Sequence, residues 1–213
     1  MSKRSKKPTK PPILNRYTSL PVLLDVLRNR HITLLSPDSW EDRNDAHYLE
    51  RYQTELKLQS LLAICFSERQ ETFHQWRVFS SGSSGLCIEF DKASLIKCVV
   101  GKPGFRAQKV DYRWIEELKT VRPDRSTWPF LKRKPFQDEE EFRIIFESTA
   151  ERLTHRSIPI DLSCIRLVTL SPWLPSPLVP AVIAAIKAIP DCTSLRVQAS
   201  SILENTDWKK AID

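Results

Sequence analysis

The sequence has little glycine and lacks the motifs of two common enzyme classes. Four of its 213 residues are glycine and 15 are proline, which argues against a glycine-rich phosphate loop. No G-x-x-x-x-G-K motif occurs, so P-loop nucleotide binding is excluded. No G-x-S-x-G nucleophile elbow occurs either, which disfavours serine hydrolysis of that type.

Patterns for metal binding, secretion and membrane insertion are also missing. The five cysteines are widely spaced, with no C-x-x-C or Cys/His ligand spacing, so we expect free thiols and no metal site. No apolar segment follows the basic start as a signal peptide would require. The most apolar stretch, residues 172–190, contains five prolines and Lys187, which disfavours a membrane span. We therefore expect a cytoplasmic protein.

The positive charge is concentrated in two segments. The formal net charge is +7, yet residues 1–12 contain five Lys or Arg and no acid, and residues 119–134 contain six against one acid. Residues 1–12 are predicted to be a disordered basic tail, because they have almost nothing to bury. The tail either improves solubility or makes weak contacts with nucleic-acid phosphates. Residues 13–213 are predicted to form one domain, as their length allows.

The apolar patterns predict alternating strands and helices. Strands are expected at 13–17, 31–35, 61–67, 86–90, 105–113, 139–148, 163–170 and 195–200. Helices are expected up to Asn29, from about residue 46 to Gln59, and over 71–79, 91–99 and 178–189. The expected fold is α+β, a single domain with a mixed, mainly antiparallel sheet flanked by helices.

Two loop regions contain candidate binding residues. The segment 40–45 combines Trp40 and Asp42 with further charged residues, and an indole on a loop usually contacts something. A solvated acidic turn is the alternative. The segment 74–84 contains Trp76 and then a serine–glycine stretch that includes Ser81, where the backbone could approach a ligand closely. A core position is the alternative for Trp76.

Glu139, Glu141 and Arg143 form the third candidate cluster. On a strand over 139–148, side chains alternate, so these three are predicted to project from one face. Two carboxylates beside a guanidinium suit ligand binding or acid–base chemistry. An exposed ladder of ion pairs on a surface sheet is the alternative.

Seven segments carry a family resemblance. In chain order they read RYTSL, LLSPDSWEDRND, CFSERQETFHQW, GLCIEFD, KPFQDEEEFRII, LSPW and RVQASSI. This order resembles the bacterial domain family of unknown function DUF 2971, over about residues 13–202 and most strongly at 85–91 and 139–144. Members often occur in phage-resistance and toxin-like contexts, so the resemblance implies an effector role.

The order of three elements is also similar to that of ADP-ribosyltransferases. By that similarity, Arg16 would hold the phosphates of NAD, the serines at 80–84 would shape the nicotinamide pocket, and Glu141 would stabilise the ribosyl cation. The chemistry is suitable, because a guanidinium matches phosphate geometry and a fixed carboxylate stabilises an oxocarbenium centre.

These observations predict one polar cleft, formed by segments that lie far apart in the sequence. Its catalytic residues would be Glu139, Glu141 and Arg143, and its ligand-binding residues Arg16, Tyr17, Trp40, Asp42, Trp76 and Ser81. We expect Arg16 and Glu141 to lie within about 10 Å, close enough to share one ligand. The leading function is a nucleotide-handling enzyme similar to ADP-ribosyltransferases, with NAD as the candidate substrate. The alternatives are a binding module for nucleic acid, through the tail and residues 119–134, and a protein that acts by contacting a partner protein. The sequence leaves the oligomeric state open.

Overall fold

The computed structural model describes residues 11–80 and 82–212. Most of the predicted basic tail therefore lies outside the described residues. The strands are β1 (Ile13–Ser19), β2 (His31–Leu35), β3 (Ser60–Ser67), β4 (Gly85–Asp91), β5 (Phe105–Lys109), β6 (Asp111–Arg113), β7 (Leu131–Arg133), β8 (Glu141–Ser148), β9 (His155–Pro159), β10 (Ile165–Leu170) and β11 (Val197–Ala199). The α-helices are α1 (Leu20–Asn29), α2 (Arg43–Glu55), α3 (Phe73–Phe79), α4 (Lys92–Lys97), α5 (Ile115–Thr120), α6 (Val179–Lys187) and α7 (Thr206–Lys210).

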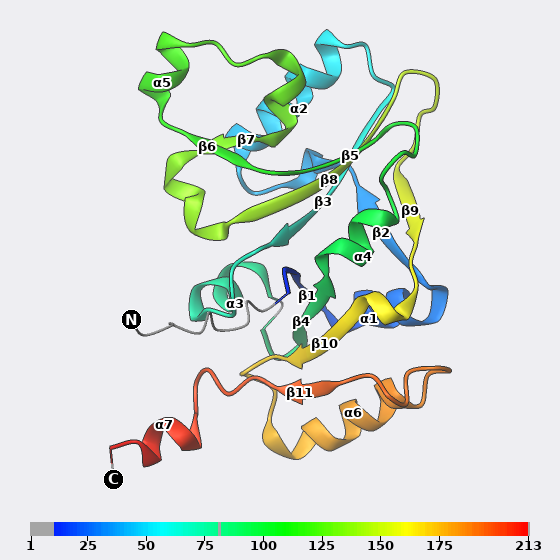
Figure 1. Ribbon diagram of the computed structural model, residues 1–213, viewed down its shortest axis with the longest axis vertical. Helices are drawn as coiled ribbons and strands as arrows, with labels where there is room; N and C mark the ends of the chain where they lie inside the picture. Colours follow the sequence, from blue (N-terminus) through cyan, green and yellow to red (C-terminus); the bar gives the residue numbers. More distant parts are fainter. Residues whose placement is uncertain (1–10, 81, 213) are drawn as a thin grey trace, which may run out of the picture.

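Most strands join one mixed, mainly antiparallel sheet, and the α+β prediction is confirmed. The order is β11-β10-β4-β1-β3-β2-β9, and β8 and β5 continue from β3 as a second branch. Only the β10–β11 pair of this sheet is parallel. Strands β6 and β7 form a separate parallel pair that lies near α2 and α5 (Figure 1).

Local sequence signals explain where helices α1 and α3 begin or end. In α1, proline occupies the first turn, Leu23, Val26 and Leu27 are buried, and Arg30 ends the helix with φ 55°. In α3, Thr72 and Gln75 form a capping box, each side chain bonding to the other residue's backbone N–H.

The two faces of the sheet pack against different helices. On one face, alternate residues of β1, β3, β4 and β8 join α1 and α4 in one large apolar core. On the other face, α2 packs over β3 and β8 through Leu49 and Tyr52. Separately, Trp76 of α3 packs on Tyr17 and Cys87.

Strands β1 and β3 part shortly after they meet. Their register contains one pair, Asn15 with Ser67, whereas β1 pairs with β4 over its whole length. The carbonyl of Cys65, two residues along β3, instead accepts a hydrogen bond from the Arg16 side chain. A gap therefore opens in the sheet between the α2 and α3 regions.

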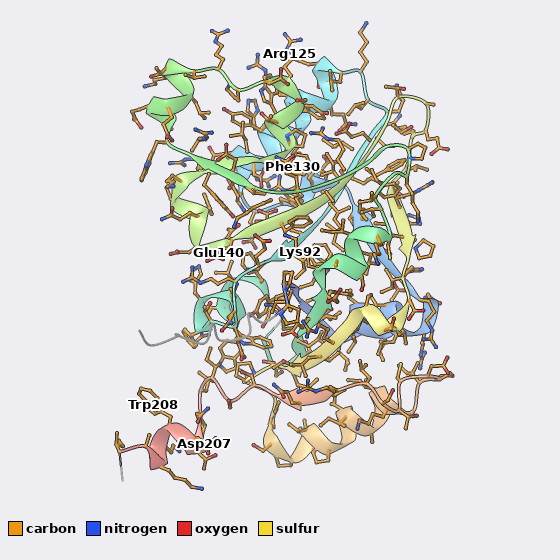
Figure 2. The ribbon with its side chains drawn as sticks, in the orientation of Figure 1. Lys92, Arg125, Phe130, Glu140, Asp207 and Trp208 are labelled. Carbon is orange, nitrogen blue, oxygen red and sulfur yellow. The ribbon has the colours of Figure 1, made fainter. Side chains whose placement is uncertain are left out.

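Several predicted boundaries were wrong. The strand expected at 105–113 is divided at Val110, because β5 pairs with β8 and β6 with β7. Helix α2 begins at Arg43, inside the expected loop, and ends at Glu55 rather than Gln59. The polar edge strand β9 and the five-residue α7 were not predicted. In Figure 2, Trp208 of α7 lies away from the sheet.

Candidate functional site

A cavity of about 420 Å³ lies where β1 and β3 part. This size is within the range of small-molecule sites. Its lining comes from five parts of the chain: Asn15, Arg16 and Tyr17; Trp40, Glu41, Asp42 and Asp45; Cys65, Phe66 and Ser67; Val78 and Phe79; and Lys132, Phe136, Glu139 and Glu141.

Arg143 is the centre of a buried ion cluster beneath this cavity. Its guanidinium is fully buried and binds Asp45 through two hydrogen bonds of 3.1 and 2.7 Å. Its Nε donates to Glu141 Oε1 at 2.8 Å, and Nη1 donates to the Pro129 carbonyl at 2.7 Å. The Trp40 ring lies over the guanidinium, 4.8 Å from Cζ to the ring centroid. These contacts fix Arg143 and the carboxylates of Asp45 and Glu141 relative to one another.

Lys132 is the second cation of the cluster. Its Nζ lies 2.5 Å from Glu139 Oε2, 3.2 Å from Glu141 Oε2 and 3.9 Å from Asp45 Oδ2. The Phe136 ring lies 5.1 Å from the same nitrogen. The cluster thus holds three carboxylates against two cations.

The three carboxylates differ in acidity. Burial alone would raise the pKa of Glu141, but Arg143 and Lys132 outweigh it and lower this pKa to about 2. Burial raises the pKa of Glu139 above its usual value, and Lys132 offsets only part of this effect. Burial likewise raises the pKa of Asp45 despite Arg143. Glu141 is therefore the carboxylate held in its ionised form, whereas Glu139 and Asp45 bind a proton more readily.

Glu141 and Glu139 also differ in hydrogen bonding. Both oxygens of Glu141 are engaged, one by Arg143 and one by Lys132. Among the described residues, only Lys132 donates to the Glu139 carboxylate, and it uses Oε2. The Oε1 atom of Glu139 is therefore open to contact a ligand or to accept a proton.

Arg16 lies on another wall of the cavity and has no anionic partner within the described part of the chain. Its Nη1 donates a hydrogen bond to the Cys65 carbonyl at 3.0 Å. Burial lowers the pKa of Arg16, although a guanidinium this basic remains charged. Its remaining N–H groups are free to bind an anion.

A chain of hydrogen bonds connects α3 with the backbone at Glu139. The Tyr17 hydroxyl donates to Gln75 Oε1 at 3.0 Å, and Gln75 Nε2 donates to Ser67 Oγ at 2.7 Å. The Ser67 hydroxyl then donates to the Glu139 carbonyl at 2.6 Å. The turn that carries Glu139 is thereby tied to both β1 and α3.

The structure brings six of the nine predicted site residues to the cavity. These are Arg16, Tyr17, Trp40, Asp42, Glu139 and Glu141. Their proposed roles stay predictions. Arg16 and Glu141 do line one cavity. Trp76 and Arg143 do not line it, because both are fully buried, Trp76 against Tyr17 and Arg143 within the ion cluster. Ser81 lies outside the described residues.

One prediction about the acidic cluster was wrong, and its alternative was wrong as well. Glu139 is not on the strand; it ends a 3-10 helix (Lys134–Glu139), and Glu140, with φ 44°, turns the chain into β8. The carboxylates of Glu139 and Glu141 are still close together, because both form ion pairs with Lys132. The cluster is also not an exposed ladder, since Glu141 is only 4% exposed.

Sequence reasoning missed Asp45 and Lys132. Asp45 follows the predicted site residue Asp42 by one helical turn, and this spacing was the available signal. Lys132 was counted in the basic segment 119–134, but it is part of the ion cluster.

Arg125 of the same segment pairs with Glu55 at 3.0 Å and lies at the outer edge of the molecule (Figure 2). The predicted nucleic-acid surface is therefore weaker than its charge count suggested.

The described residues contain neither a membrane-spanning helix nor a cluster of metal ligands. Neither residues 11–80 nor 82–212 contain a helix long and apolar enough to cross a membrane. Over the same ranges, no group of three or more His, Cys, Asp or Glu side chains could hold a metal ion.

Comparisons with known proteins give structural matches only. No family model matches the chain, and no curated protein matches it. Three solved structures of DarT from Thermus sp. 2.9 are similar, each at 13% sequence identity and each matched over 98% of its chain. The TM-scores are 0.45 for the complex with carba-NAD+, 0.47 for that with NAD+ and 0.47 for that with ADP-ribosylated ssDNA. The matches cover 93%, 93% and 95% of this chain, respectively. At these TM-scores the matches carry no argument about the function of this chain.

Proposed function

We propose that the cavity binds NAD and that the protein breaks the bond between nicotinamide and ribose, transferring ADP-ribose to an acceptor. The observation that carries this proposal is the charge arrangement. One wall has the guanidinium of Arg16, which has no anionic partner among residues 11–80 and 82–212, and another has three carboxylates against two cations. NAD has matching features, because its phosphates are anionic and its nicotinamide ring is cationic.

Arg16 would bind the phosphates. A guanidinium presents a planar fork of N–H donors that matches two phosphate oxygens. Its bond to the Cys65 carbonyl fixes the fork at the edge of the gap between β1 and β3.

Aromatic side chains would bind the rings and exclude water. Trp40, Phe79 and Phe136 line the cavity, and Trp40 and Phe136 are themselves held over the two cations of the cluster. An apolar wall with a few fixed polar groups is typical of small-molecule sites. Water exclusion strengthens the electrostatic interactions inside such a site.

The two glutamates would have different roles. When the C1′–N bond breaks, its electron pair leaves with nicotinamide and a ribosyl oxocarbenium ion forms. Glu141, which stays ionised, would stabilise that cation by its charge. Glu139, with its open oxygen and raised pKa, would accept the proton of the attacking acceptor or water. The catalytic base is thus assigned to Glu139, and Arg143 is a positioning residue.

Release of nicotinamide from NAD by the purified protein tests this proposal. Glu139→Gln should lower the rate by about 100-fold or more, the contribution expected of a general base, and should leave NAD binding within a few-fold of wild type. Asp138→Asn is the matched control, because this exposed residue of the same turn loses the same charge outside the cavity. A wild-type protein that leaves NAD intact, or a Glu139→Gln variant at full rate, would contradict the proposal.

The DUF 2971 resemblance adds an effector role in phage defence or toxicity to the proposal. Induced expression should then arrest bacterial growth while cellular NAD falls, and Glu139→Gln should abolish both effects. Growth arrest with constant NAD would favour a partner-binding role.

A further inference from the structure

Asp42 uses only one of its carboxylate oxygens to hold the fold. Its Oδ1 caps α2, accepting from the backbone N–H of Asn44 at 3.0 Å and of Asp45 at 3.4 Å. The side-chain amide of Asn44 donates to the same oxygen at 3.1 Å. This cap explains why an aspartate stands before α2.

The other oxygen, Oδ2, has no hydrogen-bond partner. It is shielded from solvent, and no described residue donates to it. Buried carboxylate oxygens are normally satisfied, so an unpaired one needs an explanation. Asp42 also lines the cavity. A donor on a bound ligand would satisfy this oxygen.

The surroundings of Asp42 disfavour an anionic ligand group at this position. Five acids line the cavity, Glu41, Asp42, Asp45, Glu139 and Glu141, against the cations Arg16 and Lys132. Lys132 is already bound to carboxylates, so Arg16 is the cation of the lining that remains for phosphate.

The nearby helix terminus does not change this conclusion. The first N–H groups of α2 could in principle attract an anion. Those of Asn44 and Asp45 already bond to Asp42 Oδ1. The group that fits beside Oδ2 is therefore a hydrogen-bond donor and not an anion.

We propose that Asp42 is a specificity residue that accepts a hydrogen bond from the adenosine 2′-hydroxyl of the dinucleotide, the hydroxyl that carries a phosphate ester in NADP. A phosphate ester on that hydroxyl would remove the donor and place two anions in contact. The cavity therefore selects NAD over NADP. This inference rests on the proposed function, because it names the part of the dinucleotide that Asp42 contacts.

Calorimetric titration of NAD and NADP into the purified protein tests the inference. Wild type should bind NAD at least tenfold more tightly than NADP. Asp42→Asn keeps a side-chain oxygen for the cap and replaces the second oxygen by a donor. Its preference for NAD should fall at least tenfold, with an unchanged melting temperature. Asp42→Ser, which also caps helices, should lose the preference too.

Asp38→Asn is the matched control, because this exposed residue of the preceding turn loses the same charge outside the cavity. It should keep the wild-type preference. If wild type binds NAD but does not discriminate, or if Asp42→Asn and Asp42→Ser keep the preference, the role of Asp42 is wrong and the proposed function stands. If wild type binds neither dinucleotide, both are wrong.

Discussion

The two faces of the sheet are built from the same strands but differ in chemistry. One face lies under α1 and α4, and the other lies under α2 and α3. In β8, Phe142, Ile144 and Phe146 join one continuous apolar core on the first face. The alternate residues on the second face include Glu141 and Arg143. Among the described residues, that face has two small apolar clusters, separated by the cavity and its ion cluster. One face therefore supplies most of the apolar burial that stabilises the fold, whereas the other has less apolar burial and holds a charged site.

The largest effect is expected where the second face holds its buried charges. Arg143→Ala should lower the free energy of unfolding by about 3–5 kcal/mol, because it leaves Asp45 and Glu141 buried without their main partner. The measurement is urea unfolding at pH 7. Ile144→Val, at the neighbouring residue on the apolar face, should cost only about 0.5–1.5 kcal/mol. Equal costs for the two variants would contradict the difference between the faces.

Replacement of Glu141 should also destabilise the protein. On an exposed strand, Glu141→Gln would cost about 1 kcal/mol or less. Glu141 is buried between Arg143 and Lys132, so the same change breaks a buried ion cluster. Glu139→Gln is therefore the better variant for separating chemistry from stability.

The pH dependence of stability should separate the carboxylates of the second face. The pKa of Glu141 is about 2 in the folded protein, below its unfolded value of about 4.3, so its contribution is complete above that value and is lost as the pH falls toward 2. The pKa values of Glu139 and Asp45 are raised, so these two groups favour folding as the pH falls toward their unfolded values. The free energy of unfolding should hold or rise from pH 7 to about 4.5 and then fall.

Urea unfolding at a series of pH values measures this profile. Glu139→Gln should reduce the rise between neutral pH and about 4.5 and leave the fall at lower pH. A steady loss of stability from pH 7 downward would show that the raised pKa values of the cluster are not those of the folded protein.

The smallest effect is expected in the hydrogen-bond chain of the α3 side. Tyr17→Phe removes the hydroxyl that donates to Gln75 and keeps the ring that packs edge-on against Trp76. The cost should be about 1 kcal/mol, the usual contribution of one hydrogen bond. A thermal melt measures it. A loss as large as that of Arg143→Ala would mean that the chain, rather than the ion cluster, holds the second face together.

Local patterns in the sequence predicted the parts of the site that depend on a single strand. Alternation in β8 places Glu141 and Arg143 on one face, as predicted. The same alternation wrongly placed Glu139 on that face of the strand, because the left-handed conformation of Glu140 interrupts the alternation before β8 begins. Lys132 could not be placed, since its position depends on the distant pairing of β7 with β6. An indole in an amphipathic helix suits either the core or a cleft, so the sequence left both positions open for Trp76. In the structure Trp76 packs against Tyr17 and belongs to the core.

Calorimetric titration of NAD into wild type and Arg16→Gln tests the central claim most directly. Arg16 lies apart from the ion cluster, so its replacement should leave that cluster intact while removing the cation free for phosphate. Wild type should bind NAD saturably, and Arg16→Gln should weaken binding by about tenfold or more, the scale of one charge-assisted hydrogen-bond pair. No binding by wild type, or equal binding by both proteins at equal melting temperature, would contradict a cavity that recognises NAD by its opposed charges.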